Sequence, residues 1–303
     1  MTAAGTHRQP LLLGCDFSSS PSRRKPIVVA LGRLQARRFE AVSFNSPALT
    51  GRILLLKTEQ FDTLNAFADW LCAEREPWVG GFDLPFGLPR ALVHALGWPT
   101  DWTRCMDHFC AQPRAALRER FKAFCDARPA GGKFAHRATD GPAGSSPSMK
   151  WVNPPVAWMM HAGVPLLRRA HATLPGLLPG RADRIALEAY PGLLAREVLG
   201  ARSYKSDDAA RQTPERLIAR KDLLAALERG LPRLNLALRL SPSQHDALAD
   251  DARGDRLDAV LCLLQAAWAL TQQHLHEARG QAASGPGWGL PDFDPLEGWI
   301  VSA

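Results

Sequence analysis

Three short apolar runs that end at or near an acidic residue constrain the fold more than any other feature of this sequence. The runs cover residues 11–16, 78–85 and 184–191, and their acids are Asp16, Asp83 and Glu188. Short, continuously apolar runs are typical of strands buried on both faces, as in parallel sheets. Because functional groups of open α/β sheets gather beyond the carboxyl ends of the strands, we expect the three carboxylates to meet at one edge.

Other patterns place these strands in an α/β order. Residues 27–31 follow the first run across a Ser/Pro-rich turn and predict a hairpin, and residues 39–44 and 53–56 read as further strands. Apolar residues from Phe61 to Leu71 recur at helical spacing, and further helices are expected over 193–199 and 214–231. Strand, hairpin, strand, helix and strand in succession indicate the α/β class.

The final predicted helix adds two more acids. Asp255 follows Gly254 and begins a long apolar helix, and Asp258 lies three residues further on, on the same face. The alternatives are local. Acids in a first turn are favoured by the helix dipole, Asp16 could cap the bend of residues 18–20, and Glu188 could pair with Arg184 or Arg196. Asp83 has no such explanation, since Gly80-Gly81 and Pro85 frame it in a backbone shape without an obvious packing purpose.

A cluster of carboxylates predicts a metal site, because the acids repel one another unless a cation neutralises them. Oxygen ligands alone select hard divalent ions, Mg²⁺ or Mn²⁺. One or two such ions can position a phosphodiester, activate water and stabilise the leaving oxygen. We therefore expect Asp16, Asp83 and Asp258 to be metal ligands, with Glu188 and Asp255 as further catalytic acids.

The segment 88–178 interrupts the regular alternation with helical pieces and Pro/Gly/Ser-rich stretches, which predicts a helical and loop insertion within one domain spanning residues 1–303. The whole net charge of +7 lies within residues 104–169, where eleven basic residues face four acidic ones. Aromatic residues interleave with them: Trp102, Phe109, Phe121, Phe124, Phe134, Trp151 and Trp158. This composition suits a phosphate backbone and stacked bases; the alternative is a solvated helix face with its aromatics in the core.

Three basic residues are candidates for holding a substrate phosphate: Arg137, Lys150 and Lys205. Ordinary surface salt bridges are the alternative for each. A composition with 46% hydrophobic and 22% charged residues excludes a disordered chain. No apolar run approaches the roughly 18 residues of a membrane span, no cleavable signal is found, and the six cysteines form no C-x-x-C pair. We expect a cytoplasmic protein with reduced thiols.

Several segments together resemble one known family. They are LLLGCDFSSS, GGFDLPFGLP, HRATDGPAGSSPSMKWVNPP, ALEAYPGLLAREVLG, SYKSDDAARQTPE, GDRLDAVLCLLQAAWA and FDPLEGWIVSA. They resemble the domain of unknown function 429 family, whose members are predicted to be RNase H-like nucleases. The resemblance implies an RNase H-like mixed five-stranded sheet flanked by helices, with strands one to three antiparallel, later strands parallel to the first, and a large insertion between the fourth and fifth.

The resemblance also implies a carboxylate site similar to that of Holliday-junction resolvases and ribonuclease H. By position, Asp16 matches the first-strand acid, Asp83 the fourth-strand acid, and Asp255 with Asp258 the acids of the last helix. Glu188 has no equally firm counterpart in those nucleases. The function expected is that of an enzyme, a nuclease or phosphodiesterase that depends on Mg²⁺ or Mn²⁺ and hydrolyses nucleic acid, DNA or RNA.

Two other functions remain open at this point. ATP-dependent phosphotransferases of the actin-like superfamily also begin with a G-x-D strand and a Ser/Thr-rich hairpin, here Gly14-Cys15-Asp16 and Ser18-Ser19-Ser20, but no second glycine-rich adenosine-binding segment is found. The other alternative is a non-catalytic nucleic-acid-binding protein that retains the fold.

Overall fold

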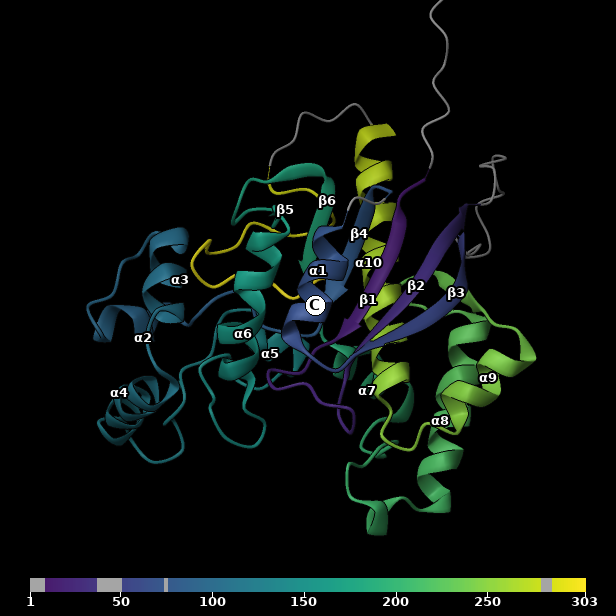
Figure 1. Cartoon of the computed structure of the whole chain (residues 1–303), viewed down its shortest axis with the longest axis horizontal. Helices are drawn as coiled ribbons and strands as arrows, with labels where there is room; N and C mark the ends of the chain where they lie inside the picture. Colours follow the sequence, from purple (N-terminus) through teal and green to yellow (C-terminus); the bar gives the residue numbers. More distant parts are fainter. Residues whose placement is uncertain (1–8, 37–50, 74–75, 279–284) are drawn as a thin grey trace, which may run out of the picture.

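The computed structural model describes residues 9–36, 51–73, 76–278 and 285–303, which form a central sheet with helices on both faces (Figure 1). The strands within these residues are β1 (Leu11–Asp16), β2 (Ile27–Ala36), β3 (Gly51–Phe61), β4 (Trp78–Phe82), β5 (Ala172–Thr173), β6 (Arg181–Glu188) and β7 (Leu236–Arg239). Their order in the sheet is β5-β6-β4-β1-β2-β3-β7, and β2 alone runs against the other six.

The predicted α/β class is thus confirmed, but the described part of the chain has a sheet of seven strands where five were expected. The two additional strands, β5 and β7, are short and lie at the two edges. Neither strand could be predicted from the sequence, because two and four residues are too few to show the alternation of a strand. The strand expected over residues 39–44 lies outside the described residues.

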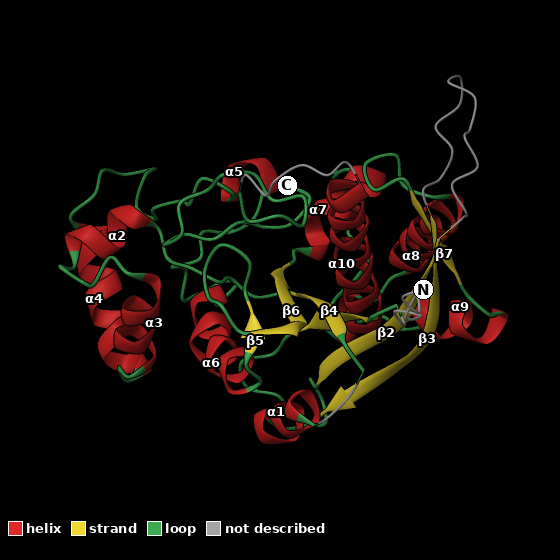
Figure 2. Cartoon of the chain, turned by 90° about the horizontal axis from the view of Figure 1, so that it is seen from above, coloured by secondary structure: helices red, strands yellow, loops and turns green. Residues whose placement is uncertain are grey.

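Helices cover both faces of the sheet. The helices of the described residues are α1 (Leu64–Cys72), α2 (Arg90–Ala95), α3 (Trp102–Cys110), α4 (Arg114–Asp126), α5 (Asp140–Ala143), α6 (Val156–Arg169), α7 (Pro191–Leu199), α8 (Pro214–Arg229), α9 (Pro242–Ala249) and α10 (Asp255–Ala278), with a short 3₁₀ helix at Ala209–Arg211. Figure 2 shows α7, α8 and α10 on one side of the sheet and α1 and α6 on the other. No helix in the described part of the chain is long and apolar enough to cross a membrane.

Side chains of each strand alternate between two cores, one on each face. On the α10 face lie Leu12, Val79 and Leu187, whereas Leu13 and Phe82 point to the opposite core with α1 and α6. Strands buried on both faces are therefore apolar without interruption, which is the pattern that identified β1 and β4 in the sequence.

Two glycines let α10 lie directly on the sheet. A Cβ atom on Gly14 of β1 would lie 2.0 Å from the carbonyl oxygen of Ala259, and one on Gly81 of β4 would lie 2.4 Å from that of Cys262. Gly81 therefore has a packing purpose, contrary to the interpretation of the sequence. Since side chains two residues apart share a face, Asp16 and Asp83 follow these glycines on the α10 side of the sheet.

The chain between β4 and β6 forms α2 to α6 together with β5. Its aromatic residues pack among α3, α4 and α6: the rings of Phe109 and Phe121 stack with their centroids 6.3 Å apart, and Trp102 is also buried. The alternative of aromatics in the core is therefore correct for these three, which cannot stack on nucleic-acid bases. Phe124, Phe134, Trp151 and Trp158 are partly buried against the same core.

Candidate carboxylate site

Three of the sequence-predicted acids come together at the carboxyl ends of β1 and β4. Asp16 ends β1, Asp83 directly follows β4, and Asp258 lies in the first turn of α10. Asp16 and Asp83 are half-buried, and Asp258 is fully buried. Their closeness follows from the glycine contacts, because α10 can present its first turn to the strand ends only by lying against the strands themselves.

These acids repel one another and so affect one another's protonation. Burial, followed by the charge of Asp258, raises the pKa of Asp16 well above its usual range. The same two causes, in the same order, raise the pKa of Asp83 to about 7. Crowded carboxylates of this kind attract either protons or a cation.

A lysine supplies a cation within the cluster. Lys205, in the loop between α7 and α8, donates from Nζ to Oδ2 of Asp258, while the neighbouring Tyr204 donates its hydroxyl to Oδ1. The charge of Lys205 also opposes the upward pKa shifts of Asp16 and Asp83. Burial disfavours the ammonium form, but the attraction of Asp258 outweighs it and raises the pKa of Lys205 well above its usual value. This residue, expected to hold a substrate phosphate, thus holds a carboxylate of the site.

The backbone of the Tyr204-Lys205 pair is fixed from several directions. Arg220 donates to the carbonyl oxygen of Tyr204 and Arg216 to that of Lys205, each at 2.8 Å. Gly254, directly before α10, has a φ of +76° and leaves no room for a side chain, since its Cβ would lie 2.8 Å from that of Lys205. A glycine at this position therefore serves both the left-handed backbone and the close approach of Lys205.

Asp255 lies at the rim of the same cluster. It is 8% exposed, and burial, followed by the charge of Asp251, raises its pKa to about 6. Asp255 and Asp16 both line a cavity of about 610 Å³ together with Ser18, Ser19 and Ser20. A carboxyl group with this pKa can accept or release a proton near neutral pH.

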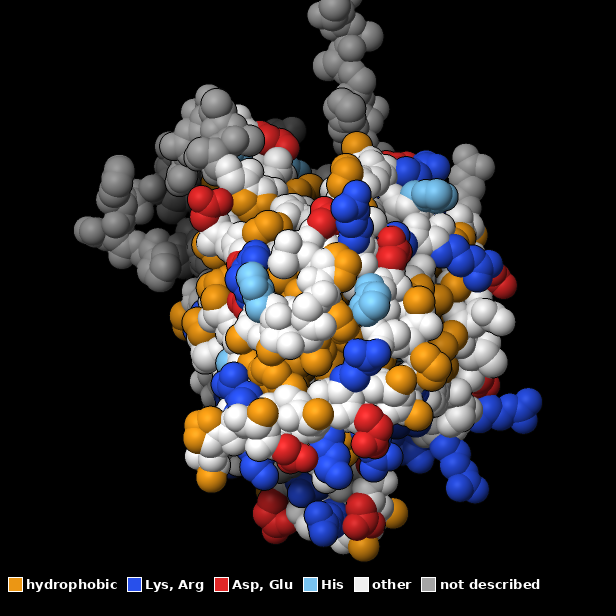
Figure 3. All heavy atoms as spheres, turned by 90° about the vertical axis from the view of Figure 1, so that its left-hand side faces the viewer, with side chains coloured by type: hydrophobic (Ala, Val, Ile, Leu, Met, Phe, Trp, Pro, Cys, Tyr) orange, Lys and Arg blue, Asp and Glu red, His pale blue; other side chains and the backbone are white. Residues whose placement is uncertain are grey.

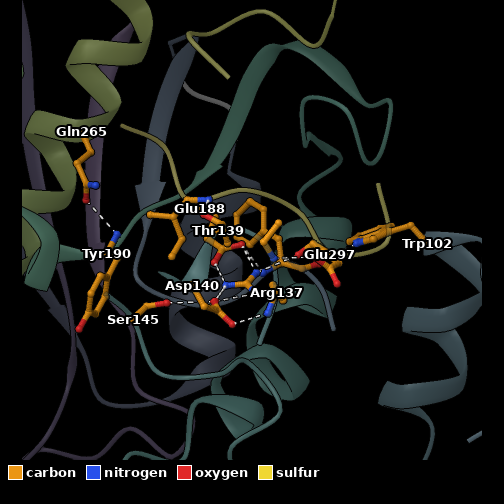
Figure 4. A network of polar contacts seen from close by, with 12 residues as sticks. Trp102, Arg137, Thr139, Asp140, Ser145, Glu188, Tyr190, Gln265 and Glu297 are labelled. Atoms are coloured by element: carbon orange, nitrogen blue, oxygen red, sulfur yellow. Dashed lines mark hydrogen bonds and ion pairs between the residues drawn. The ribbon is translucent and has the colours of Figure 1, made fainter. Parts of the chain in front are cut away.

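Glu188 lines a cavity of about 210 Å³ together with Asp83 and Lys205, and its charge adds to the rise in the pKa of Asp83, but both of its oxygens are engaged by other partners. Its two oxygens accept hydrogen bonds from Arg137, at 2.6 Å and 2.9 Å, and Oε2 also accepts one from the backbone of Phe86 at 2.9 Å (Figure 4). The physical reason is register: Glu188 pairs with Phe82, whose side chain points into the α1 and α6 core. Glu188 therefore leaves the sheet on the face opposite to Asp83, and Ala189 lies on the α10 face instead.

Arg137 is the centre of a buried network on that face. Besides Glu188 it contacts Asp140 through Nε and Nη2 and the carbonyl oxygen of Glu297 at 3.0 Å, and its side chain is 1% exposed. Glu297 in turn accepts hydrogen bonds from the backbone of Arg90 and Ala138. The network ties the C-terminal segment to the end of β6. Neither Arg184 nor Arg196 pairs with Glu188; they donate to the carbonyl oxygens of Ala170 and Ala143.

The structure therefore separates the three basic residues that the sequence singled out. Arg137 lines the 210 Å³ cavity, but its side chain is only 1% exposed and is engaged by two carboxylates. Lys150 is half-buried before α6 and is not among the residues that line the three cavities near the cluster. Lys205 lines all three of these cavities, which measure about 610, 210 and 240 Å³.

Sequence reasoning missed several members of this region. Tyr204 orients Asp258, and Asp140 and Glu297 complete the network around Arg137. Tyr204, Asp140 and Glu297 all lie in segments that contribute to the family resemblance, so that resemblance is a signal that could have found them.

The donor set of the cluster consists of carboxylate oxygens and thus suits a hard divalent ion. No group of three or more His, Cys, Asp or Glu side chains in the described ranges is arranged to hold a metal ion. All six cysteines lie within those ranges and are free thiols.

Comparison with known proteins gives one match. A family model described as "Protein of unknown function (DUF429)" matches residues 14–286. No curated protein and no solved structure matches the chain.

Proposed function

The chain belongs to the DUF429 family, and from its carboxylate cluster we propose that it is a divalent-metal-dependent nuclease or related phosphodiesterase that hydrolyses nucleic acid. The observation that carries the proposal is the meeting of Asp16, Asp83 and Asp258 at one edge of the sheet, from two parallel strands and one helix. These acids lie at the edge of the sheet where functional groups gather, and they raise one another's proton affinity. Such an arrangement costs stability, so we take it as the mark of a functional site.

An RNase H-like core is part of the proposal. Its support is the antiparallel succession of β1, β2 and β3 with β4 and β6 parallel to β1, which agrees with the arrangement that the family resemblance implies. In this interpretation residues 88–178 are an insertion between the fourth and fifth strands of that core, and β5 and β7 extend the sheet at its edges.

The acids have distinct roles in the proposed reaction. Asp16, Asp83 and Asp258 would hold Mg²⁺ or Mn²⁺, which when bound polarises the phosphodiester and lowers the pKa of water. Asp255 lines the cavity next to Asp16 and, with a pKa of about 6, can take up or release the proton of the hydrolysis. Glu188, predicted as a further catalytic acid, is assigned a supporting role: paired with Arg137, it holds the end of β6 in place beside the 210 Å³ cavity that it lines together with Asp83.

A nucleic-acid substrate is supported by basic residues on α4. Arg114, Arg118 and Lys122 are spaced four residues apart and so form a stripe on one side of the helix. Arg114 donates to the carbonyl oxygen of Ser19 at 3.2 Å, in the loop that lines the 610 Å³ cavity, and Arg118 and Lys122 are exposed. Figure 3 shows Lys and Arg side chains gathered in the lower half of the face to which α4 belongs. A stripe that begins beside the cavity suits a phosphate backbone.

A cytoplasmic location is also proposed, and the six free thiols agree with a reducing compartment.

Cleavage assays test the proposal. The purified protein with Mn²⁺ or Mg²⁺ is incubated with single-stranded, duplex, hybrid and branched DNA and RNA. We expect cleavage of at least one member, abolished in Asp16→Asn and Asp83→Asn and retained in Asp69→Asn, a surface control whose carboxyl pairs with Arg169. Cleavage that survives in the two site variants would come from a contaminant and would contradict the proposal. Salt-dependent binding without turnover under any metal would favour the non-catalytic alternative.

A further inference from the structure

We propose that Lys205 is an exchangeable cation of the carboxylate cluster: its ammonium neutralises the acids in the metal-free protein, and a divalent ion binds by displacing Nζ from Asp258. The inference rests on the proposed function in one respect, that the cluster is where the metal binds.

The position of Lys205 among the acids is the first support. Its ammonium pairs with Asp258 and acts electrostatically on Asp16, Asp83 and Asp255 as well. One positive charge thus interacts with four carboxylates, which is the place that a divalent ion would occupy.

The two oxygens of Asp258 have different partners, and this difference makes an exchange possible. Oδ1 accepts the hydroxyl of Tyr204, which is 8% exposed and held at its carbonyl oxygen by Arg220. Oδ2 accepts the ammonium of Lys205. Tyr204 can therefore keep the carboxylate oriented while Oδ2 changes from an ammonium to a metal ion.

The backbone of Lys205 is held in place, but its ammonium group has space to move. Arg216 and Ser203 donate to its carbonyl oxygen, and Gly254 lies against its Cβ. The side chain is nevertheless 42% exposed and lines three cavities. Nζ can therefore leave Asp258 by side-chain rotation alone. It then points into one of these cavities, where it could pair with a substrate phosphate.

Calorimetric titration with Mn²⁺ alone, without nucleic acid, tests the exchange. Removing the competing charge in Lys205→Met should tighten Mn²⁺ binding by about tenfold or more, because the ion no longer displaces an ammonium. The matched control is Lys25→Met: Lys25 lines the same 610 Å³ cavity and acts electrostatically on Asp255, which is not one of the three proposed metal ligands, but it pairs with Asp207 at 2.5 Å and half its side chain is exposed. Its removal should change the affinity by no more than about threefold.

A second measurement needs no variant. Mass spectrometry after brief acylation of the wild-type protein reports how accessible each lysine amine is. Saturating Mn²⁺ should increase the labelling of Lys205 severalfold and leave that of Lys25 unchanged. If Lys205 labelling stays constant or falls on metal binding, the ammonium does not leave Asp258 and the inference is wrong.

The outcomes separate this inference from the proposed function. Tighter Mn²⁺ binding in Lys205→Met, or binding in that variant alone, supports the exchange. Equal or weaker binding in a folded Lys205→Met, with wild-type binding intact, overturns the exchange and leaves the metal-dependent function standing. If neither protein binds Mn²⁺ at millimolar concentration, both the exchange and the metal-dependent function are wrong.

Discussion

Replacing Asp83 by Asn should stabilise the metal-free protein at alkaline pH, although it removes an acid of the proposed site. The folded state raises the pKa of Asp83 from 3.8 to about 7, chiefly through burial and the charge of Asp258. A raised pKa means that the folded protein favours the protonated form. The charged carboxylate therefore costs stability, and this cost grows as the pH rises from about 4 to about 7 and is complete above that.

The pKa shift sets the size of the effect. About three pKa units at 1.36 kcal/mol each give an upper limit of about 4 kcal/mol. Because Asp83 is only half-buried, solvent screens part of this energy, and we expect a gain of about 1–2 kcal/mol at pH 8. Asparagine has nearly the same shape, so the substitution changes the charge and little else.

Urea unfolding with EDTA at pH 8 and pH 4.5 measures the gain. Asp83→Asn should be more stable than wild type at pH 8. At pH 4.5 the difference should fall to about a quarter of that value, because the folded carboxyl is protonated there and the pH is close to the unfolded pKa of 3.8. Asp69→Asn, at a surface ion pair, should differ from wild type by less than about 0.5 kcal/mol at pH 8. A destabilised Asp83→Asn at pH 8, or the same difference at both pH values, would refute the electrostatic reasoning.

Three further predictions concern the parts of the fold around the site. Arg137→Met should lower the free energy of unfolding by about 3–5 kcal/mol, since it leaves Glu188 and Asp140 buried without their partner. Urea unfolding measures this, and full stability in the variant would exclude a structural role. Gly14→Ala should destabilise by roughly 3 kcal/mol or more, because the new methyl group meets the backbone of α10, whereas Gly132→Ala, with no atom nearer than 3.8 Å, should be nearly neutral; equal effects in a thermal melt would contradict the direct packing of α10. Arg118→Glu with Lys122→Glu should weaken oligonucleotide binding and reduce the slope of log affinity against log salt by about two or more. An unchanged slope in fluorescence anisotropy would mean that the α4 stripe does not contact the phosphate backbone.

The sequence predicts those site residues whose position depends on local pattern. Asp16 and Asp83 end apolar strands, and Asp258 lies on one face of a core helix with Asp255, so period and strand direction suffice to bring them together. Glu188 shows the same strand-end pattern, yet its face depends on the pairing of Phe82 with Glu188. A register shifted by one residue would reverse that face, and register cannot be read from one sequence.

Long-range partners are the second limit of sequence reasoning. Arg137 and Glu188 are 51 residues apart in the chain, and Lys205 and Asp258 are 53 apart. In the sequence, a lysine or arginine that extends into solvent cannot be distinguished from one whose charged group contacts a buried carboxylate. Only the folded chain distinguishes the buried Arg137 from Lys205, whose ammonium lies in the cluster.

The packing role of Gly81 likewise cannot be predicted from local sequence, because its contact is with the backbone of Cys262, far along the chain. From the sequence alone, a glycine that shapes the backbone near an acid cannot be distinguished from one that makes room for a packed helix. In the structure, Gly81 lets α10 lie against the sheet, and this brings Asp258 to the strand ends.

The central claim, that Asp16, Asp83 and Asp258 form a divalent-metal site, is tested most directly by a crystal structure with bound Mn²⁺, located by its anomalous scattering. The account predicts an anomalous peak within coordination distance of carboxylate oxygens of these three residues, with Nζ of Lys205 moved away from Asp258. No peak at the cluster at saturating Mn²⁺, or a peak coordinated only by other residues, would contradict it.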